Sequence, residues 1–146
     1  MLKTVLKNTL FLLVVLIGYE VIRRNVGGFA GSYPFAETWT LNKSMVDVEE
    51  NLKILQQKNP DLFLDKHELK LDNDPTGYWK IVNFYYPERN EIIKVLIRGF
   101  ENNCKVLLLS FENKNTATIR LMNKDFNWFE NRKEIKLFES RILENL

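Results

Sequence analysis

Few residues of this 146-residue chain have types and a spacing that suggest chemistry, and the segment DNDPTG at 72–77 comes closest. Asp72, Asp74 and Thr76 match the first, third and fifth positions of a calcium-binding loop, and a glycine follows at the sixth. The twelfth position is Asn83, where such a loop needs a bidentate Glu, and a proline stiffens the segment. Asn, Asp, Pro and Gly are also the residues that turns prefer. We therefore predict a turn here and no metal site.

The sequence also offers few candidate residues for nucleophilic or acid–base catalysis. Cys104 is the single cysteine, which excludes an intrachain disulfide, and it begins an apolar run of the kind in which free cysteines are buried. His67 is the single histidine and is flanked by charged residues, which indicates a solvated position, and one histidine cannot build the usual zinc site. The chain contains no G-x-S-x-G, H-E-x-x-H, P-loop or G-x-G-x-x-G motif. We therefore expect no enzyme activity and no cofactor.

The charged residues are divided unevenly between two regions. Residues 1–30 carry a net charge of +3, whereas residues 31–146 hold 17 basic and 18 acidic side chains. A nearly neutral region with well-mixed charges lacks the basic patch by which proteins bind nucleic acids. We therefore expect no nucleic-acid partner.

Aromatic side chains gather in two places that could form a ligand or partner surface. The segment YWKIVNFYY at 78–86 contains Trp79 and Tyr85, which period-two spacing puts on one face of a strand. Phe126 and Trp128 lie in a polar connection before the last helix. These four residues are the candidate site, with core packing as the alternative. We expect Trp79 to belong to the core and Trp128 to be partly exposed.

The periodicity of apolar residues predicts a helix after Ser44. Ser44 and Asp47 have the spacing of a capping box, with Asp in place of Glu. Apolar residues then recur at helical spacing, at Met45, Val48, Leu52 and Leu55. The pair Asn59-Pro60 ends the helix.

Strands joined by short turns follow in the middle of the chain. We predict strands at 78–86, 91–100, 104–111 and 116–122, and HELKLD at 67–72 would add an earlier one. Turns of three or four residues imply that neighbouring strands pair in sequence and antiparallel. The strand at 104–111 is apolar on both faces, so both faces of the sheet must be covered or the sheet must curl around a helix.

A last helix is predicted from about 129 to 146, with Ile135, Phe138, Ile142 and Leu146 on one stripe. The fold class is therefore α+β: an N-terminal hydrophobic helix, one helix, an antiparallel meander of four to five strands, and a C-terminal helix. This order of elements is loosely similar to that of helix-grip and other small α+β domains that enclose a ligand. The likeness is one of fold alone and assigns no residue a role.

The segment NTLFLLVVLIGYEVIRR at 8–24 decides where the domain works. Twelve uncharged residues, Asn8–Tyr19, follow two lysines, which is typical of a signal peptide. The stretch is short for a membrane span, but flanking lysines and arginines can extend their side chains to the interface. Because the run is apolar all round, it is atypical of a surface helix in a small domain.

Three fates of this segment remain open: an uncleaved anchor through residues 2–22, a cleaved signal, or a core helix. The best cleavage site follows Ala30, eleven residues beyond Tyr19, and Glu20, Arg23 and Arg24 intervene, which favours the anchor. Two lysines precede the span and two arginines follow it, so the free amino terminus tips the balance toward a cytoplasmic N-terminus.

The sequence thus predicts three parts: an anchor or signal segment at 1–24, a flexible linker at 25–35, and a small α+β domain at 36–146. We expect a non-catalytic accessory or interaction protein that is tethered to a membrane, with the domain outside the cytoplasm and a protein as its partner. The alternative is a helix-grip-like domain that binds a ligand in an apolar pocket, and a secreted or periplasmic location would follow from cleavage.

Overall fold

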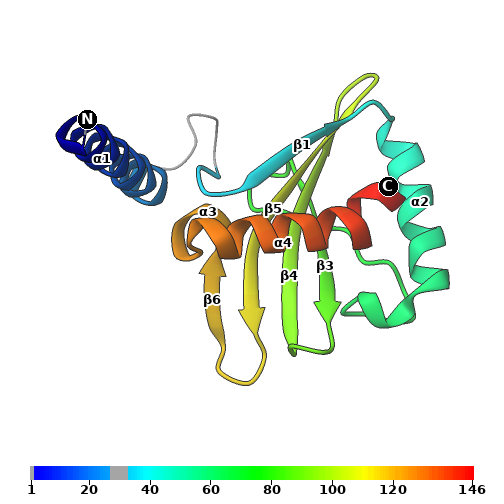
Figure 1. Ribbon diagram of the computed structural model, residues 1–146. Coiled ribbons are helices and arrows are strands. Elements are labelled where there is room, and N and C mark those ends of the chain that lie inside the picture. Colours follow the sequence, from blue (N-terminus) through cyan, green and yellow to red (C-terminus); the bar gives the residue numbers. More distant parts are fainter. Residues whose placement is uncertain (1, 27–32) are drawn as a thin grey trace.

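The computed structural model describes residues 2–26 and 33–146, which have the predicted α+β architecture (Figure 1). The helices are α1 (Leu2–Val26), α2 (Met45–Lys58), α3 (Met122–Asp125) and α4 (Trp128–Arg141), with 3-10 turns at Pro60–Leu62 and Leu143–Asn145. The strands are β1 (Glu37–Leu41), β2 (Asp72–Asn73), β3 (Lys80–Tyr86), β4 (Glu91–Gly99), β5 (Cys104–Asn113) and β6 (Thr118–Leu121).

The strands form one antiparallel sheet in the order β1-β5-β4-β3-β2, and β6 also pairs with β5. The four strands predicted between residues 78 and 122 pair in sequence and antiparallel, as expected. Two differences concern the edges. Of the strand expected at 67–72, only Asp72 lies in a strand, as the first of the two residues of β2. Strand β1 was not predicted, because it pairs with β5 across a large sequence separation and no short turn marks the pairing.

A β-bulge in β5 changes which side chains share a face of the sheet. Val95 pairs with Leu108 and Lys94 pairs with Ser110, so Leu109 is the extra residue. Strict alternation puts Phe111 on the face of Leu107 and Leu109, but the bulge moves Phe111 to the opposite face, where it is buried in the core.

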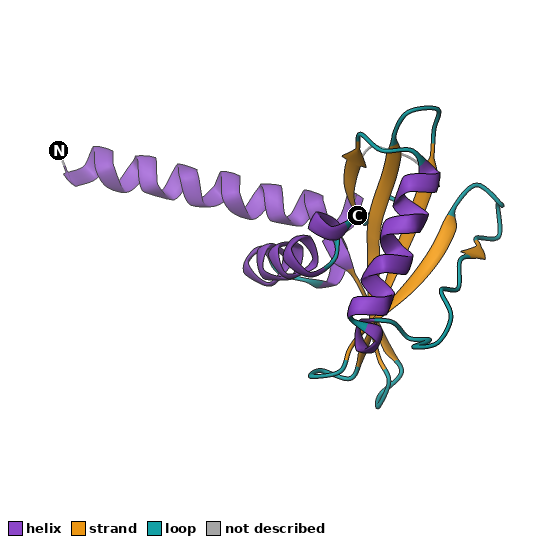
Figure 2. Ribbon diagram, turned by 90° about the vertical axis from the view of Figure 1, so that its right-hand side faces the viewer, coloured by secondary structure: helices purple, strands orange, loops and turns teal. Residues whose placement is uncertain are grey.

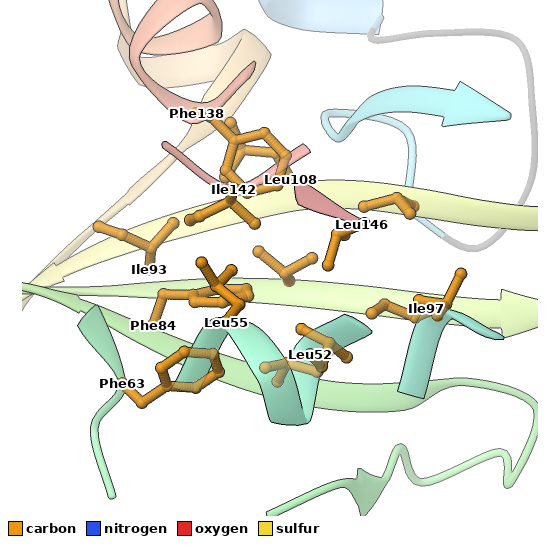
Figure 3. Packing of buried hydrophobic residues seen from close by; sticks show 14 of the residues in the cluster. Leu52, Leu55, Phe63, Phe84, Ile93, Ile97, Leu108, Phe138, Ile142 and Leu146 are labelled. Atoms are coloured by element: carbon orange, nitrogen blue, oxygen red, sulfur yellow. The ribbon is translucent and has the colours of Figure 1, made fainter. Parts of the chain in front are cut away.

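The core lies between one face of the sheet and the helices α2 and α4, and Figure 3 shows its centre. Three aromatic rings connect the layers: Phe84 of β3 lies 5.0 Å from Phe63 and 6.5 Å from Phe138 of α4, between ring centroids. Apolar residues at helical and strand spacing surround them, among them Val48, Leu52, Leu55, Ile93, Val95, Ile97, Val106, Leu108 and Ile142. These side chains pack between the two helices and the sheet.

Capping boxes begin both long helices of the domain. The Ser44 hydroxyl accepts a hydrogen bond from the backbone N–H of Asp47, and the Asp47 carboxylate accepts one from that of Ser44, as predicted. Asn127 and Glu130 form an equivalent box at the start of α4. Helix α4 ends earlier than expected, at Arg141, because the chain leaves helical geometry at Ile142.

Helix α1 is continuous and stands apart from the core. Its apolar side chains from Leu10 to Ile17 are all exposed, by 50% to 71%, so the expected separation from the sheet is confirmed. The helix runs through Asn25 and Val26, the first two residues of the segment expected to be a linker, and residues 27–32 lie outside the described part of the chain. In Figure 2, α1 projects away from the domain on the side of the sheet that α4 covers.

Candidate membrane anchor and partner surface

Helix α1 has the length and composition of a membrane span. The stretch Thr4–Asn25 has a mean hydropathy of 1.9, and the share of it buried inside the protein is 0%. A helix of 25 residues is about 37 Å long, more than the roughly 30 Å of a bilayer's hydrocarbon core. Such a helix at an N-terminus is also what a signal sequence looks like, so its contacts with the domain matter.

Arg23 attaches the end of α1 to the domain. Its guanidinium donates hydrogen bonds to the backbone carbonyls of Phe126, at 2.8 Å, and Asn123, at 3.1 Å. Both carbonyls belong to the short helix α3 and its end, where backbone acceptors have no partner inside the helix. Glu20 binds the same guanidinium at 2.8 and 3.0 Å and so holds it in place. The Arg23 side chain is only 11% exposed.

Arg98 organises a second cluster, on the face of the sheet opposite α4. Its guanidinium carbon lies 5.0 Å from the ring centroid of Phe100, 5.1 Å from that of Tyr78 and 6.0 Å from that of Trp79. The ammonium of Lys105, which pairs with Arg98 across the β4–β5 ladder, lies 5.7 Å from the Phe100 ring centroid. Tyr78 and Phe100 are exposed by 65% and 42%. We call these five side chains the Arg98 cluster.

The turn at Asp74 holds Trp79, one member of this cluster, through a hydrogen bond to its backbone. The Asp74 carboxylate accepts hydrogen bonds from the Tyr33 hydroxyl at 2.9 Å, the Thr76 hydroxyl at 2.7 Å and the Trp79 amide at 3.1 Å. Desolvation opposes its ionisation, but these bonds outweigh it and hold the pKa of Asp74 at about 2. The backbone closes the turn at Gly77, whose φ is +73°. Residues 74–77 are therefore a turn, as predicted, whereas Asp72 and Asn73 belong to β2.

The predicted site residues do not form one surface. Trp79 is half-buried in the Arg98 cluster, with Tyr33 against its edge at 6.3 Å between centroids. Tyr85 lies on the same face of the sheet, half-buried, with its hydroxyl bonded to Asn90 and Lys114 beside its ring. Trp128 is 49% exposed at the start of α4, on the other side of the sheet.

Phe126 is a correction, because it belongs to the core. It is 1% exposed, its ring lies 5.1 Å from that of Phe111, and Arg120 covers it at 4.1 Å. The polar letters around it suggested a surface position. The short helix α3 instead turns Phe126 inward while leaving its polar neighbours outside.

No family model, curated protein or solved structure matches this chain. Its own residues therefore carry the functional argument.

Sequence reasoning missed a charged network between α4 and the end of the sheet at which β3 turns into β4. Arg89, in the turn after β3, donates two hydrogen bonds to Glu134 of α4, at 2.6 and 2.9 Å, and its Nε lies 3.0 Å from Glu91. Both carboxylates are nearly buried. The one available signal was that Glu134 falls on the apolar stripe of α4, four residues before Phe138. The Tyr86 ring packs on the Arg89 guanidinium, and burial raises the pKa of this tyrosine.

Cys104 and His67, the two residues considered for chemistry, lie in different surroundings. Cys104 is buried with its sulfur 3.9 Å from that of Met45, and burial raises the pKa of the thiol. His67 lines an open depression of about 470 Å³ among charged side chains. Across residues 2–26 and 33–146, no three His, Cys, Asp or Glu side chains are placed to hold a metal. None of the four predicted aromatic residues lines this depression.

Proposed function

We propose that this chain is a single-pass membrane protein whose α+β domain is a non-catalytic accessory or interaction module. The observation that carries the proposal is the combination found in α1: apolar side chains with no cover inside the protein, ending at an arginine bonded to the domain. A helix with this composition needs an apolar surrounding, and the domain leaves its Leu10–Ile17 stretch exposed.

The charges of α1 divide it into a lipid part and a surface part. Glu20, Arg23 and Arg24 form an ionic group at the C-terminal end. The 18 residues Leu2–Tyr19 before them would be about 27 Å long, close to the hydrocarbon thickness of a bilayer, with Lys3 and Lys7 extending their side chains to the opposite interface. The ionic group would then lie at the lipid–water boundary, where charged side chains are tolerated.

Retention of α1 is favoured over cleavage. Cleavage after Ala30 would remove Arg23 and leave the carbonyl groups of Asn123 and Phe126 without the donor that now satisfies them. An arginine that completes the folded domain is unexpected in a disposable signal. The positive charges that flank the span are balanced, two lysines before it and two arginines after it, and an extracytoplasmic domain is the orientation that we propose.

Membrane extraction of the full chain tests the anchor. The full chain should stay in the membrane pellet at alkaline pH, at its full-length mass. Leu13→Arg with Leu16→Arg should release it or prevent insertion, because charges in the span are costly. The matched control adds the same charges at exposed apolar positions of the domain, Val46→Arg with Ile119→Arg, and should stay in the pellet. Release of the unaltered chain, or a mass lacking α1, contradicts the proposal.

For the partner surface we propose the Arg98 cluster, and an acidic segment of another protein as its ligand. Exposed Tyr and Arg side chains are enriched in interface hot spots, and two cations at one place, Arg98 and Lys105, attract carboxylates. A photocrosslinker at Tyr78 in intact membranes should give one adduct that maps to an acidic segment. Arg98→Glu should abolish it, and a crosslinker at exposed Glu50 should not give it. An adduct that maps elsewhere contradicts this assignment.

A further inference from the structure

We propose that the outer face of α4 rests on an anionic lipid leaflet and so fixes how the domain stands on the membrane. This inference rests on the proposed anchoring through α1 and adds a second membrane contact. The surface is defined by Trp128, Phe129, Arg132, Lys133 and Lys136, which we call the α4 face. All five side chains are exposed.

The helical period separates the α4 face from the core. Asn131, Glu134 and Phe138 are buried on the side that packs on the sheet. At 100° per residue, Phe129 and Lys133 lie on the opposite side of the helix. Lys136 lies one turn farther along that side, so the three form a continuous exposed stripe.

Helix α1 supplies the direction of the membrane. Arg23 joins the end of α1 to Asn123 and Phe126, immediately before α4 begins. Figure 2 shows α1 from the side, and it extends from the domain on the side of the sheet where α4 lies. If residues 2–19 cross the bilayer, the α4 face is therefore turned toward the lipid headgroups, and the Arg98 cluster on the opposite face of the sheet is turned away.

The charges of the α4 face suit a negatively charged surface. Arg132, Lys133 and Lys136 are basic, and they outnumber the two acidic residues at the edges of this face, Glu130 and Glu139. Glu130 accepts a hydrogen bond from the backbone of Asn127 in the capping box, and Glu139 accepts one from the Trp39 indole at 3.1 Å. Basic clusters close to a membrane anchor are attracted to anionic lipids.

The aromatic pair suits the interfacial layer of a bilayer. Phe129 is 77% exposed and Trp128 is 49% exposed, and their rings meet edge to face at 5.0 Å between centroids. Arg132 lies over the Trp128 ring, at 5.6 Å from its centroid. Trp is enriched at membrane interfaces because its ring is apolar and its N–H is polar. An exposed Trp–Phe pair beside the end of a membrane helix therefore fits lipid better than water.

Quenching of Trp128 by lipid in the full chain tests the proposal. Trp39→Phe and Trp79→Phe leave Trp128 as the single tryptophan. The protein is placed in nanodiscs of phosphatidylcholine with or without phosphatidylglycerol, and the acyl chains carry bromine near the headgroup. We expect Trp128 to be quenched in the anionic discs, with most of the quenching lost on Lys133→Glu with Lys136→Glu.

Two exposed lysines of α2 provide the matched control. Lys53→Glu with Lys58→Glu makes the same charge change on a helix that lies farther from α1, and it should leave quenching unchanged. If the tryptophan replacements impair folding, a spin label at Lys136→Cys measures exposure to lipid-soluble oxygen instead, since Cys104 is buried.

The outcomes separate the two proposals. A chain that enters the discs but shows no quenching overturns the α4 contact and leaves the anchor standing. A chain that stays outside the discs overturns both. Equal quenching in neutral discs, or quenching insensitive to the lysine reversals, overturns the role of anionic lipid. A crosslinker at Phe129 that captures a protein instead of lipid assigns the α4 face to a protein partner.

Discussion

The Arg23 guanidinium and the Phe126 carbonyl oxygen lie 2.8 Å apart although 103 residues separate them in the chain. This hydrogen bond, with that to Asn123, joins the C-terminal part of α1 to the one-turn helix α3, which directly precedes α4. We expect the contact to restrict how the domain turns at the end of α1.

We predict that Arg23→Ala loosens the domain from α1 without unfolding it. Spin labels at Val21→Cys and Lys124→Cys, both exposed positions, should give a narrow distance distribution that broadens in the variant. Arg24→Ala is the control, because the Arg24 guanidinium bonds to Glu20 within α1. An unchanged distribution in Arg23→Ala would show that the contact does not orient the domain.

The second prediction concerns the network under α4. Arg89→Met should lower the free energy of unfolding by about 3 kcal/mol, because it leaves the nearly buried Glu134 and Glu91 without their cation. Chemical unfolding of the full chain in mild detergent measures this loss. Combining Arg89→Met with Glu134→Met should cost less than the sum of the single changes. Lys53→Met, on the exposed side of α2, should change stability little, and additive losses would contradict the coupling.

Local patterns predicted the parts of this fold that depend on neighbours in the chain. The Ser44–Asp47 capping box and the hairpins between residues 80 and 121 are formed by residues close together in the chain, so short sequence motifs are enough to predict them. Strand β1 and the Arg23 contact join segments far apart in the chain, and no short motif marks such pairing. Phe111 lies on the opposite face of the sheet from the one that strict alternation predicts, because Leu109 forms a bulge. Leu109 is apolar like its neighbours, so the sequence does not mark it as the bulge residue.

The site was only partly predictable for a similar reason. Trp79 and Trp128 could be found because groups of aromatic residues stand out in the sequence. The expected partial exposure of Trp128 is confirmed, whereas Trp79 is only half-buried and lies outside the core cluster in which we expected it. Their basic neighbours could not be assigned, since Arg98 meets Tyr78 and Trp79 only after β3 and β4 pair. The same criterion, an aromatic residue among polar neighbours, also selected Phe126, which is a core residue.

The third prediction tests the approach of β4 to α2. A Cβ added at Gly99 would lie 2.6 Å from the Cβ of Met45, which is too close for either to remain in place. We expect Gly99→Ala to destabilise the protein by about 1–3 kcal/mol, the usual cost of overpacking. Gly18→Ala, whose added Cβ meets nothing within 4 Å, is the control. Equal stability of the two variants would contradict the close contact.

The fourth prediction ranks three aromatic residues by thermal stability. Phe126→Ala should cost about 3–5 kcal/mol, since its ring is fully buried. Trp128→Ala should stay within about 0.5 kcal/mol, as expected for an exposed site. Trp79→Ala should fall between them, because its ring is half-buried against Tyr33 and Arg98. Melting temperatures of the full chain give the order, and a large loss in Trp128→Ala would contradict its exposure.

The last prediction uses pH to test the turn that supports the Arg98 cluster. The pKa of Asp74 is about 2 in the folded chain, below the value of about 3.9 for an unperturbed aspartate. The carboxylate therefore stabilises the fold above pH 4, and this contribution is lost as the pH falls toward 2. Asp74→Asn should lower the stability most at neutral pH, and the difference from the parent should shrink between pH 4 and 2.

Asp65, whose pKa is also about 2, should keep some acid dependence in both proteins. Tyr33→Phe removes one donor and should show a smaller change in the same window. Denaturant unfolding at several pH values measures these differences, with Glu101→Gln at an exposed carboxylate as the control. A stability difference for Asp74→Asn that stays constant from pH 7 to 2 would show that the hydrogen bonds of this carboxylate do not depend on its charge.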